Sequence, residues 1–150
     1  MADPGSLPVD QIIKMLSGIP FFKNFSTYEK KRIAGNSSCI VKIGSGKKII
    51  KDGASDTSFF ILIKGEVVVE KKGAAIIGMS SGEFFGEMAF LTGEKRNTDV
   101  IAQEACVLVQ VDHELLTRLS AEIREKIKDQ IIEKLVERLN KTTERLRVRM

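Results

Sequence analysis

The feature that most constrains this chain is the spacing of glycines between short apolar runs from Cys39 to Val111. Runs rich in β-branched residues favour strands, and glycines between them favour tight turns. Seven glycines separate the runs: Gly44, Gly46, Gly53, Gly65, Gly73, Gly78 and Gly82. Many short strands at this spacing predict an antiparallel β-roll, similar to a jelly roll, with about eight strands.

Helical patterns precede the strand-rich region. Apolar residues from Ile12 to Leu16 recur at helical spacing, and Gly18-Ile19-Pro20 interrupts the pattern. Ser26 is followed three residues later by Glu29, which is the spacing of a capping box at the start of a helix. We therefore predict short helices at the N-terminal end of the chain.

A longer helical pattern follows the strand-rich region, and Asp112 and Ser120 are suited to cap the helices there. Two apolar stripes run along it, one at four-residue spacing and one at heptad-like spacing. The first holds Ile127, Ile131, Leu135 and Leu139, and the second holds Ile132, Leu135, Leu139 and Leu146, with Thr142 at the intervening position. We expect one stripe to pack on the roll and the other to be available to a second copy of the chain or to an effector domain.

These patterns divide one domain into three segments. We predict an N-terminal helical segment at residues 1–38, the β-roll at residues 39–111, and C-terminal helices at residues 112–150. The fold class is α+β and mainly β. A chain of 150 residues that is 43% hydrophobic and 29% charged is large enough to bury one core without metal or disulfide support.

The composition predicts a cytoplasmic protein. No apolar run approaches the roughly 18 residues that span a bilayer, so we predict no membrane insertion. The segment Met1–Ser6 lacks the charged and apolar regions of a signal peptide. Cys39 and Cys106 lie in apolar stretches without the spacing of a metal site, and we expect both to be buried free thiols.

The net charge of +4 is mild, and much of it comes from the end of the chain. A basic helix end complements the helix dipole, and no aromatic residues are interleaved there to stack on bases. The basic residues are Arg138, Lys141, Arg145, Arg147 and Arg149. Only 39 residues of the sequence, 112–150, follow the roll, too few for the final helix and a helix-turn-helix, so we predict no DNA partner.

The segment from Phe85 to Val100 carries the chemistry. Gly86 permits close approach to the backbone, and the helix formers that follow it leave unpaired amides that attract anions. Glu87 is an acceptor that suits sugar hydroxyls, and Arg96 offers forked donors that match phosphate oxygens. The intervening Thr92-Gly93-Glu94-Lys95 has the composition of a turn that brings the two charges to one site.

This segment, Phe-Gly-Glu-Met-Ala-Phe followed by a turn and Arg-Asn-Thr-Asp-Val, resembles the phosphate-binding cassette of cyclic nucleotide-binding domains, at residues 85–100. Examples of the family are catabolite activator proteins and the regulatory subunits of cyclic-AMP-dependent protein kinase. The resemblance extends from Ile12 to Leu119. It includes the helical entry Ile19–Ser26 and the hairpin segments Lys47–Gly53 and Phe59–Val69.

The resemblance implies a sensor that binds a cyclic nucleotide and couples binding to movement of its C-terminal helix. Glu87 resembles the acceptor of the ribose 2′-hydroxyl, and Arg96 the partner of the cyclic phosphate. An apolar residue near Ile127, Ile131 or Leu135 is expected to cover the base. The full set of expected ligand-binding residues is Phe85, Gly86, Glu87, Met88, Ala89, Arg96, Asn97 and Thr98.

Two positions differ from patterns found in the family. Some members brace the arginine with an acidic residue in a Gly-Glu-x-Asp hairpin, and here Val68 stands at that place. Arg96 is then expected to be oriented by another group or to be held less rigidly. Members selective for cyclic GMP tend to carry Thr or Ser directly after the arginine, whereas Asn97 occupies that place and the hydroxyl comes at Thr98. Cyclic AMP is therefore the favoured ligand, and cyclic GMP remains open.

Other chemistries have weaker support. A metal-binding cupin needs several histidines, and His113 is the single histidine of the sequence, at an expected helix start. Gly44-Ser45-Gly46-Lys47-Lys48 lacks the first glycine and the final hydroxyl residue of a P-loop. We therefore expect no catalytic activity, no metal and no cofactor. The alternative is an interaction or dimerisation module that uses this fold without binding a nucleotide.

Overall fold

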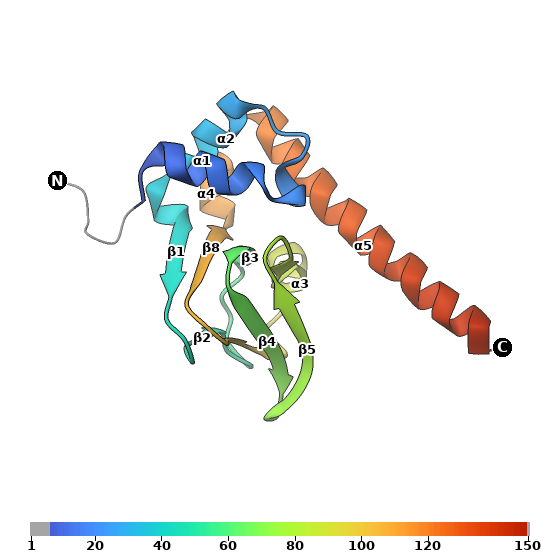
Figure 1. Ribbon diagram of the computed structural model, residues 1–150. Coiled ribbons are helices and arrows are strands. Elements are labelled where there is room, and N and C mark those ends of the chain that lie inside the picture. The colour runs from blue at the N-terminus through green and yellow to red at the C-terminus, as the bar shows by residue number, and fades with distance from the viewer. Residues whose placement is uncertain (1–6, 150) are drawn as a thin grey trace.

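Two four-stranded antiparallel sheets form the centre of the computed structural model, which describes residues 7–149 (Figure 1). The strands are β1 (Ile40–Ile43), β2 (Lys48–Ile50), β3 (Phe59–Lys64), β4 (Glu66–Lys71), β5 (Ala74–Ser80), β6 (Phe84–Phe85), β7 (Asp99–Ala102) and β8 (Cys106–Val111). One sheet has the order β1-β8-β3-β6 and the other the order β2-β7-β4-β5. The predicted roll of about eight strands is confirmed.

Helices flank the roll at both ends of the chain, as the sequence predicts. They are α1 (Val9–Ser17), η1 (Pro20–Phe22), α2 (Thr27–Ala34), η2 (Ser37–Cys39), α4 (His113–Thr117) and α5 (Ala121–Arg149), and α3 (Glu87–Thr92) is inserted between β6 and β7. The capping box of α2 is present, with Ser26 and Glu29 each accepting a hydrogen bond from the other's amide. Asp112 caps α4 by accepting from the amide of Leu115 at 2.7 Å.

The central strand β3 divides the interior into two apolar clusters, because successive side chains of a strand point to opposite faces. Phe59, Ile61 and Ile63 pack in a cluster with the flanking helices. Phe60 and Leu62 pack in the second cluster, inside the roll. That second cluster also contains Ile50, Phe85 and Val100, which form one wall of the cavity described below.

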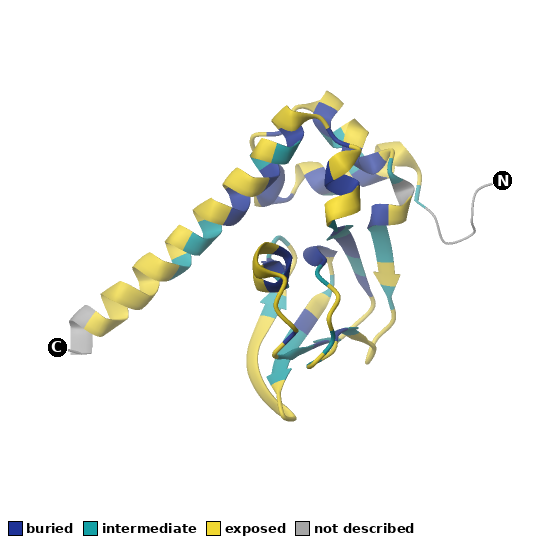
Figure 2. Cartoon of the chain, turned by 180° about the vertical axis from the view of Figure 1, so that it is seen from behind, coloured by how far each residue is buried: buried dark blue, intermediate teal, exposed yellow. Residues whose placement is uncertain are grey.

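The long helix α5 has one buried face over its first half, whereas its second half is mostly exposed, and its colouring shows this change (Figure 2). Ile127 and Ile131 are buried with the flanking helices, and Leu135 is partly buried against the same cluster. Leu139, which belongs to both predicted stripes, is 65% exposed, so the packed part of the first stripe ends before it. The reason is geometric: α5 is straight and runs away from the helical layer (Figure 1).

Both cysteines are buried free thiols, as predicted. Across the described residues, 7–149, the structure contains no helix with the length and apolar character of a membrane span. The segment Met1–Ser6, on which the signal-peptide prediction depends, lies outside the described residues, as does Met150 at the end of the predicted C-terminal segment.

Glu29 joins α2 to α5. Its Oε1 accepts hydrogen bonds from Lys126 Nζ at 2.6 Å and from the amide of Ser26 at 2.8 Å. The hydrogen bond from Lys126, followed by that from the Ser26 amide, lowers the pKa of Glu29. The ionised Glu29 carboxylate therefore stabilises the fold fully above the unfolded-state pKa of about 4.3. This stabilisation is lost as the pH falls through the lower folded-state pKa.

We expect Glu29→Gln to reduce the free energy of unfolding by about 1 kcal/mol at neutral pH, and to have less effect in acid. Urea unfolding followed by circular dichroism over the acid range measures both. Glu133→Gln is the matched control, because the pair between Glu133 and Lys23 is about half exposed on both sides and such pairs contribute little. A loss for Glu29→Gln that does not shrink in acid would contradict the role of the charge.

Candidate functional site

The helix α3 begins at a glycine with a backbone conformation that no other residue adopts easily. Gly86 has a φ of 83°, in the left-handed region. A Cβ atom at this position would lie 2.9 Å from Ile50 Cδ1, 3.0 Å from Arg96 Nη1 and 3.2 Å from the carbonyl oxygen of Ser58. Both the backbone angle and the close approach of Arg96 therefore require glycine here.

Arg96 is a buried cation with a fixed orientation. Its side chain is 3% exposed. Nη1 donates to the carbonyl oxygen of Gly86 at 2.9 Å, and Nη2 donates to Asp56 Oδ2 at 2.9 Å and to the carbonyl oxygen of Ser58. Among the buried side-chain nitrogen and oxygen atoms of residues 7–149, Arg96 Nε is the one without a hydrogen-bond partner. An unpaired buried donor costs roughly 1–3 kcal/mol, which an incoming acceptor would recover.

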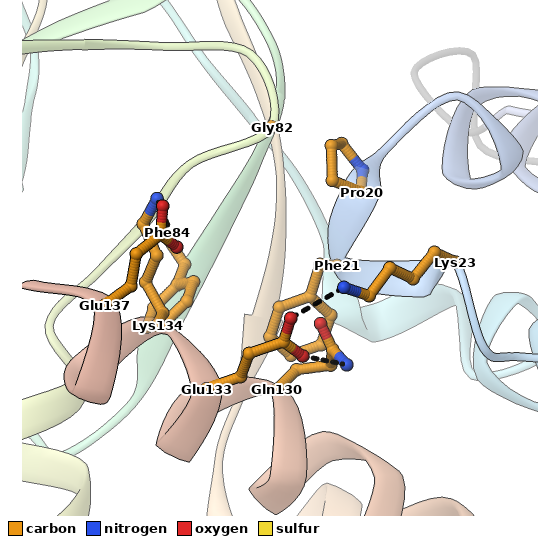
Figure 3. A pocket seen from close by; sticks show the side chains of 9 residues that line it. All are labelled: Pro20, Phe21, Lys23, Gly82, Phe84, Gln130, Glu133, Lys134 and Glu137. Carbon is orange, nitrogen blue, oxygen red and sulfur yellow. Dashed lines mark hydrogen bonds and ion pairs between the residues drawn. The ribbon is translucent and has the colours of Figure 1, made fainter.

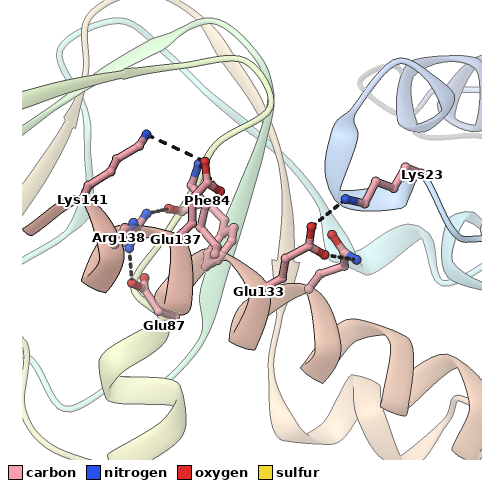
Figure 4. Close-up of polar contacts among 9 residues, drawn as sticks. Lys23, Phe84, Glu87, Glu133, Glu137, Arg138 and Lys141 are labelled. Atoms are coloured by element: carbon pink, nitrogen blue, oxygen red, sulfur yellow. Dashed lines mark hydrogen bonds and ion pairs between the residues drawn. The ribbon is translucent and has the colours of Figure 1, made fainter. Parts of the chain in front are cut away.

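Glu87, in the first turn of α3, is paired with the long C-terminal helix. Its side chain is 8% exposed, and Oε1 accepts from Arg138 Nη1 at 2.6 Å (Figure 4). The guanidinium of Arg138 also lies 5.4 Å from the centre of the Phe84 ring, within the range of a cation–π contact. The helix α5 is therefore attached directly to the segment that follows β6.

These side chains surround a cavity of about 280 Å³, near the lower end of the roughly 300–1,000 Å³ typical of small-molecule sites. All eight residues predicted to bind ligand line it: Phe85, Gly86, Glu87, Met88, Ala89, Arg96, Asn97 and Thr98. The remaining lining residues are Ile50, Val69, Ile77, Met79, Glu94, Lys95, Val100 and Arg138. The cavity thus combines an apolar wall from the strands with a buried cation and a buried carboxylate.

Two residues of this arrangement are missing from the sequence prediction. Asp56 supplies the negative charge beside Arg96. Some family members have an acidic residue at the position of Val68, which here pairs in the sheet with Gly78 and Ile101. Arg138 appears in the sequence only as part of a basic run. No local pattern marks either residue, because Asp56 lies 40 residues from its partner and Arg138 lies 51 residues from Glu87.

A second pocket, of about 120 Å³, lies between η1 and α5 (Figure 3). Lys23 Nζ pairs with Glu133 Oε1 at 2.7 Å across it, and Gln130 Nε2 donates to the other carboxylate oxygen at 3.2 Å. Its volume is less than half that of the first cavity, and these polar groups already bond to one another. We regard it as part of the contact between α5 and the N-terminal helices.

His113 has a structural position, as expected. Its ring stacks on Phe90 with the ring centres 4.2 Å apart, and its Nε2 lies 3.1 Å from the Phe90 carbonyl oxygen. Among residues 7–149, no group of three or more His, Cys, Asp or Glu side chains is arranged to hold a metal ion.

Comparison with known proteins gives a consistent result. The family model for the cyclic nucleotide-binding domain matches residues 40–122, more than half of the chain. The chain is 28% identical over 111 residues to a cGMP-dependent protein kinase of Eimeria tenella, covering 74% of this chain and 11% of the relative. It is 30% identical over 115 residues to a cAMP-dependent protein kinase regulatory subunit of Neurospora crassa, covering 75% of this chain and 30% of the relative.

A solved structure described as Sp-2Cl-cAMPS bound to PKAR CBD2 is also similar. It superposes with a TM-score of 0.67 at 30% identity, and the match covers 93% of this chain and 94% of that one. The two curated relatives are much longer, so the chain corresponds to less than a third of either. The similarity is thus to one domain of such proteins.

Proposed function

Because this chain belongs to the cyclic nucleotide-binding domain family, we propose that its cavity binds a cyclic nucleotide and that the chain is a regulatory module without catalytic activity. The observation that supports this most directly is Arg96, a buried cation that lines the cavity and whose Nε lacks a partner. A cyclic phosphate carries one negative charge and several acceptor oxygens. It would therefore pair with the positive charge of Arg96 and accept a hydrogen bond from its Nε. The predicted location remains the cytoplasm.

In this proposal Arg96 pairs with the cyclic phosphate and Glu87 accepts a hydrogen bond from the ribose 2′-hydroxyl. Asn97 and Thr98 complete the phosphate environment, and the backbones of Gly86 and Ala89 approach the ligand. Phe85 and Met88 belong to the wall of the cavity, whose other apolar side chains suit the flat face of a purine. Cyclic AMP is preferred over cyclic GMP because Asn97, rather than a hydroxyl residue, follows Arg96.

The pair between Glu87 and Arg138 supports coupling of the ligand to α5. A ribose hydroxyl would compete with Arg138 for the same carboxylate, so nucleotide binding would change the free energy of the contact between α5 and α3. A residue near Ile127, Ile131 or Leu135 is expected to cover the base, and in this structure the first two are packed in the helical core while Leu135 is partly buried against it. Covering the base with either of the first two residues therefore requires α5 to move.

Isothermal titration calorimetry with cyclic AMP and cyclic GMP tests the proposal. We expect saturable binding of cyclic AMP at one site, well below millimolar concentration, and weaker binding of cyclic GMP. Circular dichroism of the same sample establishes that the protein is folded. If neither nucleotide binds the folded protein at millimolar concentration, the proposal fails.

The exposed face of α5 supports a second candidate function, as an interaction module. Ile132, Val136 and Leu139 are 57%, 50% and 65% exposed and lie on one side of the helix. Burying such a face against a second copy of the chain, or against an effector domain, is favourable. Failure to bind nucleotide, together with a dimer that sedimentation detects and Leu139→Asp dissociates, would replace the first function with this one.

A further inference from the structure

We propose that Lys71, which lies outside the cavity, orients the peptide group between Asn97 and Thr98 and so strengthens the part of the cavity that would bind the phosphate. This proposal rests on the proposed function, since it assigns a role at the same cavity. Lys71 is the last residue of β4, and its Nζ donates to the carbonyl oxygen of Asn97 at 2.7 Å. Asn97 and Thr98 line the cavity, whereas Lys71 does not.

The sheet brings Lys71 to this place. The strands β4 and β7 are antiparallel neighbours, and Glu70 pairs with Asp99 at one end of the ladder. The next residue of β4 is Lys71, and the residue before Asp99 is Thr98, so the end of β4 lies beside the segment that joins α3 to β7. The contact follows from the register of the sheet, because Lys71 and Asn97 are 26 residues apart in the sequence.

A carboxylate of the neighbouring turn also holds the lysine. Lys71 Nζ pairs with Asp52 Oδ2 at 3.3 Å. The amide of Asp52 donates to Asp99 Oδ1 at 2.8 Å, which fixes that turn to β7. An exposed lysine with a single partner is usually held weakly. Here the ammonium group has two acceptors, the Asp52 carboxylate and the Asn97 carbonyl oxygen, and both belong to segments that are fixed to β7.

The orientation of the peptide group follows from this contact. The carbonyl of Asn97 and the amide of Thr98 belong to one trans peptide, in which the C=O and N–H bonds point in opposite directions. Because the carbonyl is directed toward Lys71, the amide is directed away from it, on the side of the cavity that Thr98 lines. Within residues 7–149, no backbone carbonyl accepts a hydrogen bond from this amide. It is therefore available to an acceptor in the cavity.

The charge of Lys71 explains what the contact adds to binding. A hydrogen bond from an ammonium group to a carbonyl oxygen is stronger than one between neutral groups. It also polarises the peptide group, so the N–H at the other end becomes a better donor. A phosphate oxygen that accepts from the Thr98 amide would gain from this polarisation. Lys71 thus contributes to the binding of an anion without occupying any of the cavity.

Isothermal titration calorimetry of Lys71→Met tests the role. We expect cyclic AMP to bind about three- to fivefold more weakly, a modest change because the lysine side chain is 44% exposed. Lys71→Arg keeps the charge and can still donate to the carbonyl oxygen, so it should recover most of the affinity. Lys72→Met is the matched control, because it removes the same charge from the next residue, which is also exposed, and should change the affinity by less than about twofold.

The NMR signal of the Thr98 amide provides a readout that needs no ligand. In the unliganded protein we expect Lys71→Met to shift this signal, because it removes the hydrogen bond to the carbonyl of the same peptide group, and we expect Lys72→Met to leave it in place. Equal affinities of the wild-type protein and Lys71→Met, or equal losses in the two methionine variants, would overturn the proposal.

The same signal separates this proposal from the proposed function. If the wild-type protein binds no nucleotide, the proposed function fails, and the Thr98 signal still decides whether Lys71 orients the peptide group. A shift in Lys71→Met that Lys71→Arg reverses would support the orientation. An unchanged signal in Lys71→Met would overturn it.

Discussion

Replacing Arg96 with alanine is expected to weaken cyclic AMP binding by well over tenfold, because removing one partner of a desolvated charge pair costs roughly 2–5 kcal/mol. The side chain is 3% exposed, so water does not screen its charge effectively. Isothermal titration calorimetry of the variant and the wild-type protein measures the change. Arg96→Lys keeps the charge but loses the forked donors, and we expect it to fall between the two.

The control for Arg96→Ala is Lys95→Ala, which removes a neighbouring positive charge that also lines the cavity. Lys95 is exposed, so its charge is screened and we expect only a small loss of affinity. Equal losses in the two variants would mean that the cavity responds to overall positive charge and not to the buried guanidinium. Thermal unfolding of each variant separates a loss of binding from a loss of fold.

Gly86→Ala is expected to have the second large effect, on both stability and binding. Its new Cβ would lie 2.9 Å from Ile50 Cδ1 and 3.0 Å from Arg96 Nη1, at a φ of 83°. The backbone strain alone costs roughly 1–2 kcal/mol, and the contacts add to it or displace Arg96 from its partners. We expect a loss of about 2–4 kcal/mol in the free energy of unfolding and severely weakened cyclic AMP binding.

Gly93→Ala is the matched control, because Gly93 ends the same helix with a φ of 75° and no other atom lies within 4 Å of the position of its Cβ. This variant carries the backbone strain without the contacts, and we expect a loss of about 1–2 kcal/mol with near-normal binding. Chemical unfolding and calorimetry on both variants test the comparison. Similar losses of stability and affinity in both would show that the crowding around Gly86 is unimportant.

The local features of the fold are predictable from the sequence because neighbouring residues determine them. Short apolar runs separated by glycines correspond to the strands, and Ser26 and Glu29 form the capping box that their spacing indicates. The segment from Phe85 to Thr98 is predictable for the same reason. Its glycine, its helix formers and its turn are consecutive in the chain, so the residues expected to bind ligand come to line one cavity.

How far the first stripe of the last helix packs is not predictable from residue spacing. Helical spacing places Leu139 on the same stripe as Ile127 and Ile131, and this much follows from 3.6 residues per turn. Spacing says nothing about where the surface under the helix ends. Because α5 extends past the helical layer, Ile131 is 1% exposed and Leu139 is 65% exposed.

The sequence by itself determined the strands, the caps, the cassette and the two charges that it carries, since each depends on residues close together in the chain. Only the tertiary structure decided what those charges touch. Asp56 reaches Arg96 because the loop after β2 folds against it, and Arg138 reaches Glu87 because α5 passes beside α3. These two contacts join residues 40 and 51 positions apart in the sequence, so they depend on how strands and helices pack. The pattern of residues along a single sequence does not specify that packing.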